Sequence, residues 1–280
     1  MSRTVLKQYR ALSDDIGDLR TQRPLPNDEL EQLDPFLFLN HHGPQVYPPN
    51  NRGLPFGPHP HRGFETVTFI LEGSLAHRDS GGHESVIHAG GVQWMTAGRG
   101  LEHAELSPEE FLRDGGPLEI LQLWVNLPAR LKMTEPRYIG LQRDQIPAVR
   151  SDGVTVNLIS GLFDGQRGPV DSLTGIHMTT LEMPAGSRIR LDAPRERTVF
   201  CYVVRGDLQQ GREMHLLHFD DDGDAVELEA VRDAVVLFGH GAPYREPVVA
   251  HGPFVMNTRE EIVQAIRDYQ AGLFGERIED

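Results

Sequence analysis

The stretch FETVTFILEGSL, residues 64–75, decides the fold: a strand-like run of eight residues is followed by a charged residue and a glycine. β-branched and aromatic residues favour strands, and glycine after a charged residue is typical of a tight turn, so a β-hairpin is predicted here. The stretch VFCYVVRGDL, residues 199–208, has the same order of an apolar run, a charged residue, glycine, a small polar residue and leucine. This similarity predicts two related β domains in one chain.

Short apolar runs bounded by turn residues continue through both halves of the chain. Four lie at 64–71, 85–87, 92–95 and 118–125, and a second set lies between 154 and 238. Strands of this length and spacing are typical of an all-β sandwich or barrel. The segment 133–153, of mixed polarity, separates the two sets, so we expect domains at residues 1–140 and 141–280. Thr258 and Glu261 form a capping box before an apolar stripe, which predicts one C-terminal helix.

Composition excludes several classes of protein. The chain has 280 residues and a net charge of −14, which disfavours direct binding to nucleic acid or to an anionic membrane surface. No apolar run is long enough to span a bilayer, and no signal peptide is visible, so we expect a cytoplasmic protein. Cys201 is the single cysteine, so no intrachain disulfide forms, and the acidic run 220–222 is expected to be a solvated loop.

Two closely spaced pairs of side chains carry the chemistry. His59 and His61 precede the 64–71 strand, and His103 and Glu105 follow a glycine-rich turn at the same spacing of two residues. Residues two apart on a strand share a face, so each pair points one way. A lone histidine pair near a turn is usually a surface pair or a hydrogen-bonded pair. Two such pairs around one hairpin-rich unit favour a site for a divalent transition metal, with two octahedral positions left open.

At these residues the sequence resembles the pirin family of the cupin superfamily. The resemblance is carried by five segments spread over most of the chain: PHPHRGFETVT (58–68), VQWMTAGRG (92–100), HAE (103–105), LQLWVNLP (121–128) and GPFVMNT (252–258). It implies two tandem cupin domains of the jelly-roll type. It also implies that His59, His61, His103 and Glu105 hold one divalent metal, usually iron as Fe(II), although manganese, cobalt, nickel, copper and zinc stay open.

Glu65 matches the carboxylate ligand of the general cupin motif, but in pirins the carboxylate comes from the place of Glu105. We therefore expect Glu65 outside the ligand set, with a hydrogen bond to a ligand imidazole as its possible role. The three histidines at 77, 83 and 88 are expected to be solvated. The C-terminal domain is expected to lack metal ligands, because Asp192, Pro194, Tyr244 and Glu246 stand at the corresponding positions.

The resemblance implies two alternative functions. Pirin relatives include quercetin 2,3-dioxygenases, which cleave a flavonol with O2, and here Glu105 would act as ligand and general base. A small aromatic substrate would then lie in an apolar pocket between Trp94, Met95 and neighbouring strands, whereas Trp94, Met95 and Trp124 are otherwise expected to line the interior of the barrel. The alternative is a metal-containing regulatory protein that binds a transcription factor or a metabolic enzyme. A monomer is expected in either case.

Overall fold

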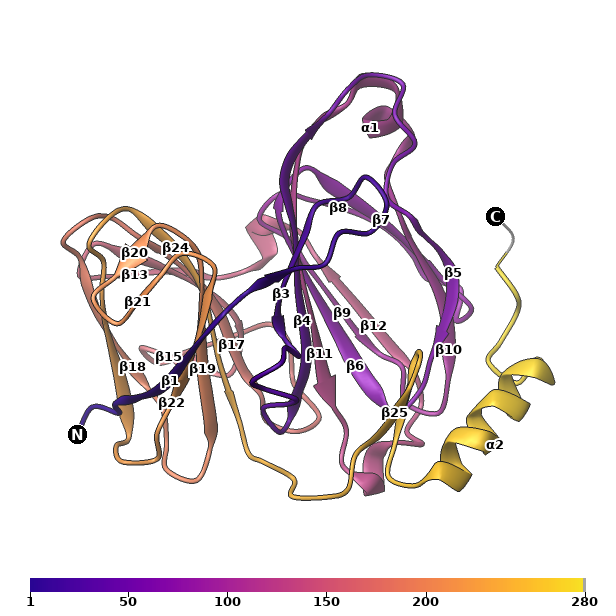
Figure 1. The fold of residues 1–280 in the computed structure, drawn as a ribbon. Coiled ribbons are helices and arrows are strands. Elements are labelled where there is room, and N and C mark those ends of the chain that lie inside the picture. Colours follow the sequence, from indigo (N-terminus) through magenta and orange to yellow (C-terminus); the bar gives the residue numbers. More distant parts are fainter. Residues whose placement is uncertain (279–280) are drawn as a thin grey trace. The chain divides into compact units, whose positions relative to one another are not determined.

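The computed structural model describes residues 1–278 and divides into two compact units. The N unit comprises residues 13–21, 36–143 and the residues from Tyr244 onward, and the C unit comprises residues 1–12, 22–35 and 144–243. In the middle of the chain the two units meet between Arg143 and Asp144. Strand β1 (Val5–Arg10) belongs to the C unit because it pairs with β22 (His215–Phe219). Figure 1 shows both units.

Most of the N unit consists of strands. Their bounds are β4 (Phe36–Tyr47), β5 (Phe56–His61), β6 (Phe64–Glu72), β7 (Ser74–Asp79), β8 (Glu84–His88), β9 (Val92–Thr96), β10 (Leu101–Leu106), β11 (Gly116–Asn126), β12 (Arg137–Leu141), β25 (Val249–His251) and β26 (Phe254–Met256). The order β12-β9-β6-β11-β4 forms one sheet, and β5-β10-β7-β8 forms the other. The helices are α1 (Glu109–Asp114), η1 (Ala129–Leu131) and α2 (Arg259–Gln270). Strands β2 (Leu12–Ser13) and β3 (Thr21–Leu25) and the short helix η2 (Arg143–Gln145) span the limits of the units.

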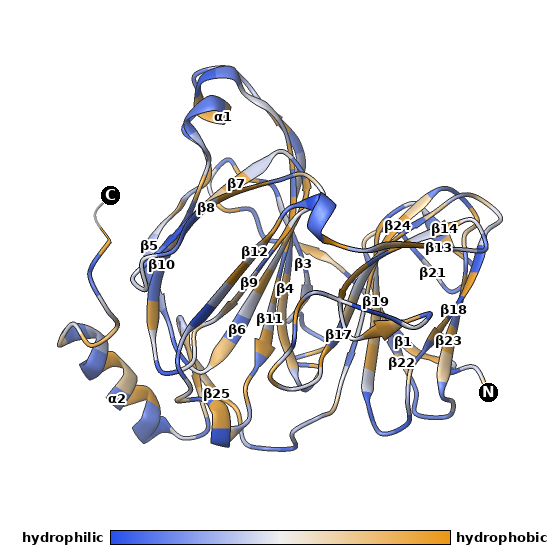
Figure 2. Cartoon of the chain, turned by 180° about the vertical axis from the view of Figure 1, so that it is seen from behind, coloured by the Kyte–Doolittle hydropathy of each residue, from blue (hydrophilic) through white to orange (hydrophobic). Residues whose placement is uncertain are grey.

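Pairing within the larger sheet of the N unit decides which residues face the inside of the barrel. Thr66 lies opposite Met95 on β9 and Trp124 on β11, whereas Val67 lies opposite Trp94. Directly opposed residues share a face of a sheet, and successive residues alternate. Met95 and Trp124 therefore share one face, and Trp94 lies on the other. Figure 2 shows the strongly hydrophobic stretches of β11 and the hydrophilic character of much of α2.

Gly63 makes the tight connection between β5 and β6. Its φ is +88°, and a Cβ placed there would collide with the backbone oxygen of Val255. A residue with a side chain would therefore be strained at this position and would also push β26 away. The helix α2 begins at the predicted capping box, with the Thr258 side chain accepting from the Glu261 N–H. Ile262 and Ala265 then pack against apolar residues of β26.

The C unit is a second set of antiparallel strands around an apolar core. Its seven-stranded sheet has the order β1-β22-β19-β24-β17-β14-β13. The further bounds are β13 (Ala148–Ser151), β14 (Val154–Ser160), β15 (Leu162–Phe163), β16 (Gln166–Arg167), β17 (His177–Met183), β18 (Arg188–Asp192), β19 (Thr198–Arg205), β20 (Asp207–Leu208), β21 (Gly211–Arg212), β23 (Ala225–Glu229) and β24 (Ala234–Gly241). Cys201 lies in this core, fully buried, and burial raises the pKa of its thiol.

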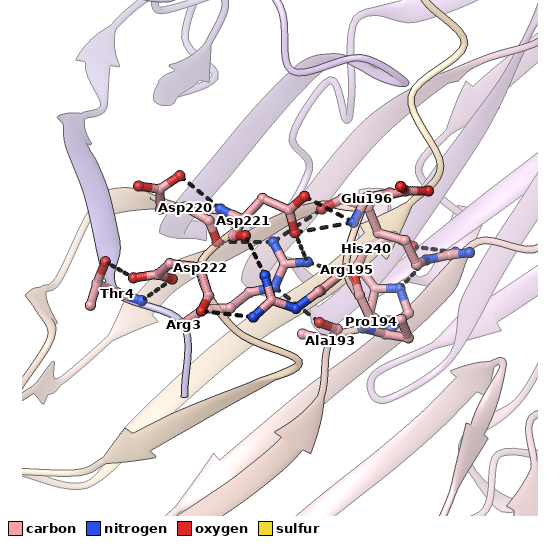
Figure 3. Close-up of polar contacts among 11 residues, drawn as sticks. Arg3, Thr4, Ala193, Pro194, Arg195, Glu196, Asp220, Asp221, Asp222 and His240 are labelled. Carbon is pink, nitrogen blue, oxygen red and sulfur yellow. Dashed lines mark hydrogen bonds and ion pairs between the residues drawn. The ribbon is translucent and has the colours of Figure 1, made fainter. Parts of the chain in front are cut away.

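The acidic run 220–222 is an exposed loop, as expected from the sequence, and it also binds the first residues of the chain. The Arg3 guanidinium, whose side chain is 1% exposed, donates to the Asp221 carboxylate at 2.8 Å. Its other hydrogen bonds go to the backbone oxygens of Ala193, Pro194, Arg197 and Asp220. The Asp222 carboxylate accepts from the backbone N–H and the hydroxyl of Thr4. Figure 3 shows how these contacts hold the start of the chain against the loops at 193–196 and 220–222 of the same unit.

Candidate metal centre

Three imidazoles converge on the paired strands β5 and β10. His59 lies directly opposite His103 in the register, and His61 lies two residues further along β5. The ring centroids of the three histidines are 4.4–4.9 Å apart, and one ring nitrogen from each lies within 4.8 Å of the others. The Nε2 atoms of His59 and His103 are 3.0 Å apart. Among residues 1–278, this is the one group of three or more potential ligands gathered in such a way.

Backbone oxygens orient two of the rings. Nδ1 of His59 lies 2.8 Å from the oxygen of Gly57, and Nδ1 of His61 lies 3.3 Å from the oxygen of Pro253. A ring that donates from Nδ1 carries its lone pair on Nε2, which is the usual arrangement of a metal-binding histidine. Pro253 lies in the turn between β25 and β26, and its contribution could not be predicted because a backbone oxygen has no signature in the sequence.

The electrostatics keep the imidazoles of His61 and His103 neutral. Burial, followed by the neighbouring His59, lowers the pKa of His61 to about 3, with the Pro253 oxygen opposing the shift. Burial and the adjacent histidines also lower the pKa of His103 well below its ordinary value. Metal binding requires unprotonated imidazole, so both rings are ready for a cation at neutral pH without first losing a proton. Three imidazole nitrogen donors fit a divalent transition metal.

Glu105 lies on β10, two residues beyond His103, but is not a member of the imidazole cluster. Its carboxylate accepts a hydrogen bond from the Thr68 hydroxyl at 3.1 Å and one from the Gln122 amide at 2.6 Å. The register of β10 against β7 is unbroken from His103 to Glu105, so the two side chains share a face of β10. The register shift against β5 comes from an extra residue on β5. The Glu105 carboxylate, which is 3% exposed, is therefore hydrogen-bonded to side chains of β6 and β11.

Glu65 lies on the face of β6 opposite to the histidines. Phe64, whose ring centroid lies 4.9 Å from that of His61, immediately precedes it, and consecutive residues on a strand point to opposite faces. The Glu65 carboxyl accepts from the Thr96 hydroxyl at 2.6 Å, and burial raises its pKa. The suggested hydrogen bond from Glu65 to a ligand imidazole is therefore wrong, because the strand turns this side chain away from the site.

The apolar surroundings of the cluster also differ from those expected. The Trp124 ring lies 5.4 Å from His61, 4.4 Å from Phe64 and 4.7 Å from Phe38, measured between centroids. Trp94 belongs to the opposite face of the sheet and does not line this space. The sequence could not separate the two tryptophans, because residues on both faces of these strands are buried and the usual polar–apolar alternation is missing.

His77 is buried rather than solvated as expected. Its ring stacks on Tyr138 at 4.0 Å, and its Nε2 lies 3.0 Å from the Asp79 carboxylate, which also contacts the exposed His83. Burial alone would raise the pKa of Asp79, but hydrogen bonds from His77 and His83 hold it below its ordinary value. His88 is exposed, as predicted. Buried and half-buried residues alternate along β7, with residues 75, 77 and 79 buried. This alternation would have predicted a buried His77, whereas the spacing of the histidines did not.

The C unit has a smaller group of polar rings. His177 on β17 lies opposite His240 on β24, and their rings stack at 4.7 Å. Arg197 donates to Nδ1 of His240. Burial is the main cause that lowers the pKa of His177 to about 4. Two imidazoles beside a guanidinium lack a third donor and carry a positive neighbour, so this pair is a poor site for a cation.

Comparison with known proteins gives the family. The family model for pirin matches residues 18–125, and the model for the pirin C-terminal cupin domain matches residues 178–275. This chain belongs to the pirin family. The expected all-β fold with two cupin domains and a C-terminal helix is thereby confirmed for this pirin.

Individual relatives cover nearly the whole pirin chain. Pirin of Homo sapiens is 41% identical over 272 residues, which cover 93% of this chain and 89% of the human protein. A pirin-like protein of Caulobacter vibrioides is 42% identical over 281 residues, or 97% and 99% of the two chains. The crystal structure of quercetin 2,3-dioxygenase from Acinetobacter baumannii superposes with a TM-score of 0.90 at 32% identity, covering 99% of this chain and all of that one (100%). No helix within residues 1–278 has the length and hydropathy needed to cross a membrane.

Proposed function

We propose that this pirin is a metal-dependent dioxygenase that cleaves a flavonol or a related enol substrate with O2. The observation that carries the proposal is the cluster of three imidazoles, with a buried carboxylate two residues beyond one of them. The similarity to a quercetin 2,3-dioxygenase over the whole chain supports the choice of reaction. His59, His61 and His103 would hold the metal, with Glu105 as the fourth ligand, and Fe(II) is the proposed ion.

A divalent transition metal bound at these nitrogens would supply Lewis acidity and a partner for O2 chemistry. The pirin chain supplies the acid–base group. Glu105 would accept the proton of the substrate hydroxyl on one carboxylate oxygen, as a general base within hydrogen-bond reach. Thr68 and Gln122 orient the carboxylate for that transfer, because each donates to a different oxygen.

The neighbouring rings favour a planar substrate. Phe64 and Trp124 lie against His61, so they give the histidine cluster an apolar aromatic flank against which a flat aromatic molecule would pack. Burial against this flank also excludes water from the reacting groups. The contacts of Phe64 and Trp124 thus support an aromatic substrate on structural grounds that do not depend on the name of any relative.

Oxygen uptake tests the proposal. The protein, loaded anaerobically with Fe(II), Mn(II), Co(II), Ni(II) or Cu(II) in separate samples, is mixed with quercetin and O2. Turnover is expected with at least one metal, and it should be lost in His59→Ala and Glu105→Gln but kept in the exposed controls His88→Ala and Glu84→Gln. No oxygen uptake with any metal would overturn the dioxygenase proposal. Binding of a protein partner that depends on the redox state of the metal, without such uptake, would identify the regulatory alternative.

A further inference from the structure

Two charged side chains next to the histidines are buried on the outside of the barrel. Arg62 follows His61, and Glu102 precedes His103, so both point away from the imidazole cluster. Each is 4% exposed. Charged side chains are rarely buried to this extent unless they are paired, so their partners show what covers this part of the barrel.

The partner of Arg62 lies on the last turn of α2. The guanidinium donates from Nη1 to the Asp268 carboxylate at 2.7 Å and from Nε to the backbone oxygen of Arg99 at 2.6 Å. It also lies over the ring of Phe274, 4.6 Å from the centroid. Arg62 is thus bound on one side by its own barrel and on the other by the C-terminal segment.

The partner of Glu102 is the next residue of the same helix. The Tyr269 hydroxyl donates to one oxygen of the Glu102 carboxylate at 2.6 Å, and the backbone N–H of Ile278 donates to the other at 3.0 Å. Figure 1 shows α2 beside the strands β5 and β10 that carry the three histidines. Consecutive residues of α2 therefore contact the neighbours of two different histidines.

The segment before α2 reaches the same place from the backbone. The Pro253 oxygen faces Nδ1 of His61, and the Val255 N–H donates to the Arg62 oxygen at 3.0 Å. The C-terminal segment 253–278 therefore contacts His61 directly and fixes the residues adjacent to His61 and His103 through side chains.

We propose that the segment 253–278 is a working part of the metal centre, with Asp268 and Tyr269 as positioning residues for His61 and His103; the inference rests on the proposed metal site. The physical reason is that affinity for a metal depends on the angle and separation of its ligands, so groups that orient those ligands change affinity without touching the ion. Removing the two contacts frees β5 and β10 to shift at the ligand positions while the barrel stays folded.

Titration with Co(II) tests this inference, because the visible spectrum of bound Co(II) reports the geometry of its ligands. The double variant Asp268→Asn, Tyr269→Phe keeps the size of both side chains. It is expected to bind Co(II) about tenfold more weakly than the wild type, with an altered spectrum, at a temperature well below its unfolding midpoint. The single variant Asp268→Glu keeps the charge and leaves Tyr269 in place, so it should bind Co(II) almost as tightly as the wild type. The control Glu135→Gln breaks an exposed ion pair with Arg99 near the same site and should bind normally.

The outcomes separate the two proposals. An unchanged Co(II) affinity and spectrum in the double variant, even with a lowered unfolding midpoint, would show that Asp268 and Tyr269 only stabilise the fold and would overturn the inference. Weaker binding with a changed spectrum in a protein that consumes no O2 with quercetin would support the inference and overturn the dioxygenase proposal. Failure of the wild type to bind Co(II) would overturn both.

Discussion

Replacing Lys132 by methionine should destabilise the N unit by about 3 kcal/mol. The Lys132 ammonium is 1% exposed and donates to the oxygen of Gly63 at 2.9 Å, the side chain of Asn126 at 2.8 Å and the oxygen of Val255 at 2.9 Å. A buried acceptor left without a donor costs about 1–3 kcal/mol. Three acceptors at about 1 kcal/mol each give the stated loss of about 3 kcal/mol. The lower end of the range is used because the substitution also removes the cost of burying the ammonium charge.

Tryptophan fluorescence during urea unfolding measures this loss in the N unit alone, because both tryptophans of the chain, Trp94 and Trp124, lie in that unit. The Arg113→Met variant is a matched control, since the Arg113 side chain is 64% exposed and pairs only with its neighbour Asp114 in an exposed ion pair. The control should change stability by less than about 0.5 kcal/mol. A loss below about 1 kcal/mol for Lys132→Met would refute the reasoning about the three acceptors.

Lys132 should also make the stability of the N unit depend on pH. Burial lowers the pKa of Lys132 from 10.5 to about 8. Between pH 8 and 10.5 the unfolded chain therefore binds more protons at this position than the folded chain, so stability from Lys132 rises with pH in this window and falls as pH drops through 8. The difference in stability between the wild type and Lys132→Met should grow across that window, by up to about 3 kcal/mol. A constant difference would contradict the shift.

Three further perturbations test other parts of the structure. The Gln122→Leu variant removes one donor from the Glu105 carboxylate and should lower kcat for O2 uptake about tenfold with the fold unchanged by circular dichroism. Arg3→Met should destabilise the C unit by about 3 kcal/mol, because five acceptors lose the guanidinium that donates to them. The readout is labelling of buried Cys201 by a thiol reagent, about 100-fold faster than in the wild type. Gly63→Ala should lower the unfolding midpoint of the N unit by several degrees, and an unchanged midpoint would show that the collision with β26 is easily relieved.

Local patterns predicted the elements of the fold well. The run at residues 64–71 is within β6 (Phe64–Glu72), and the capping box at Thr258 starts α2. Both features depend on residues close together in sequence, where strand propensity and helix capping act directly. The spacing of His59, His61 and His103 was informative for the same reason, and the structure brings these three rings together.

Long-range pairing set the limits of prediction. The assignment of β1 to the C unit depends on its partner β22, far along the chain, and no local pattern near β1 indicates that partner. The role of the acidic run 220–222 depends in the same way on Arg3. The face occupied by Trp94 was hidden because its strand is buried on both sides, so alternation gave no direction.

The exchange of chain ends between the units has a consequence for biosynthesis. The strands that bear the histidines, β5 and β10, emerge from the ribosome early, but their covering helix α2 emerges only after the whole of the intervening C unit has been translated. Until then Arg62 and Glu102 remain uncovered beside the imidazoles. Assembly of the proposed centre is thus coupled to translation of residues 253–278, and a nonsense codon or proteolytic cut after Asn257 would impair a site encoded almost two hundred codons upstream.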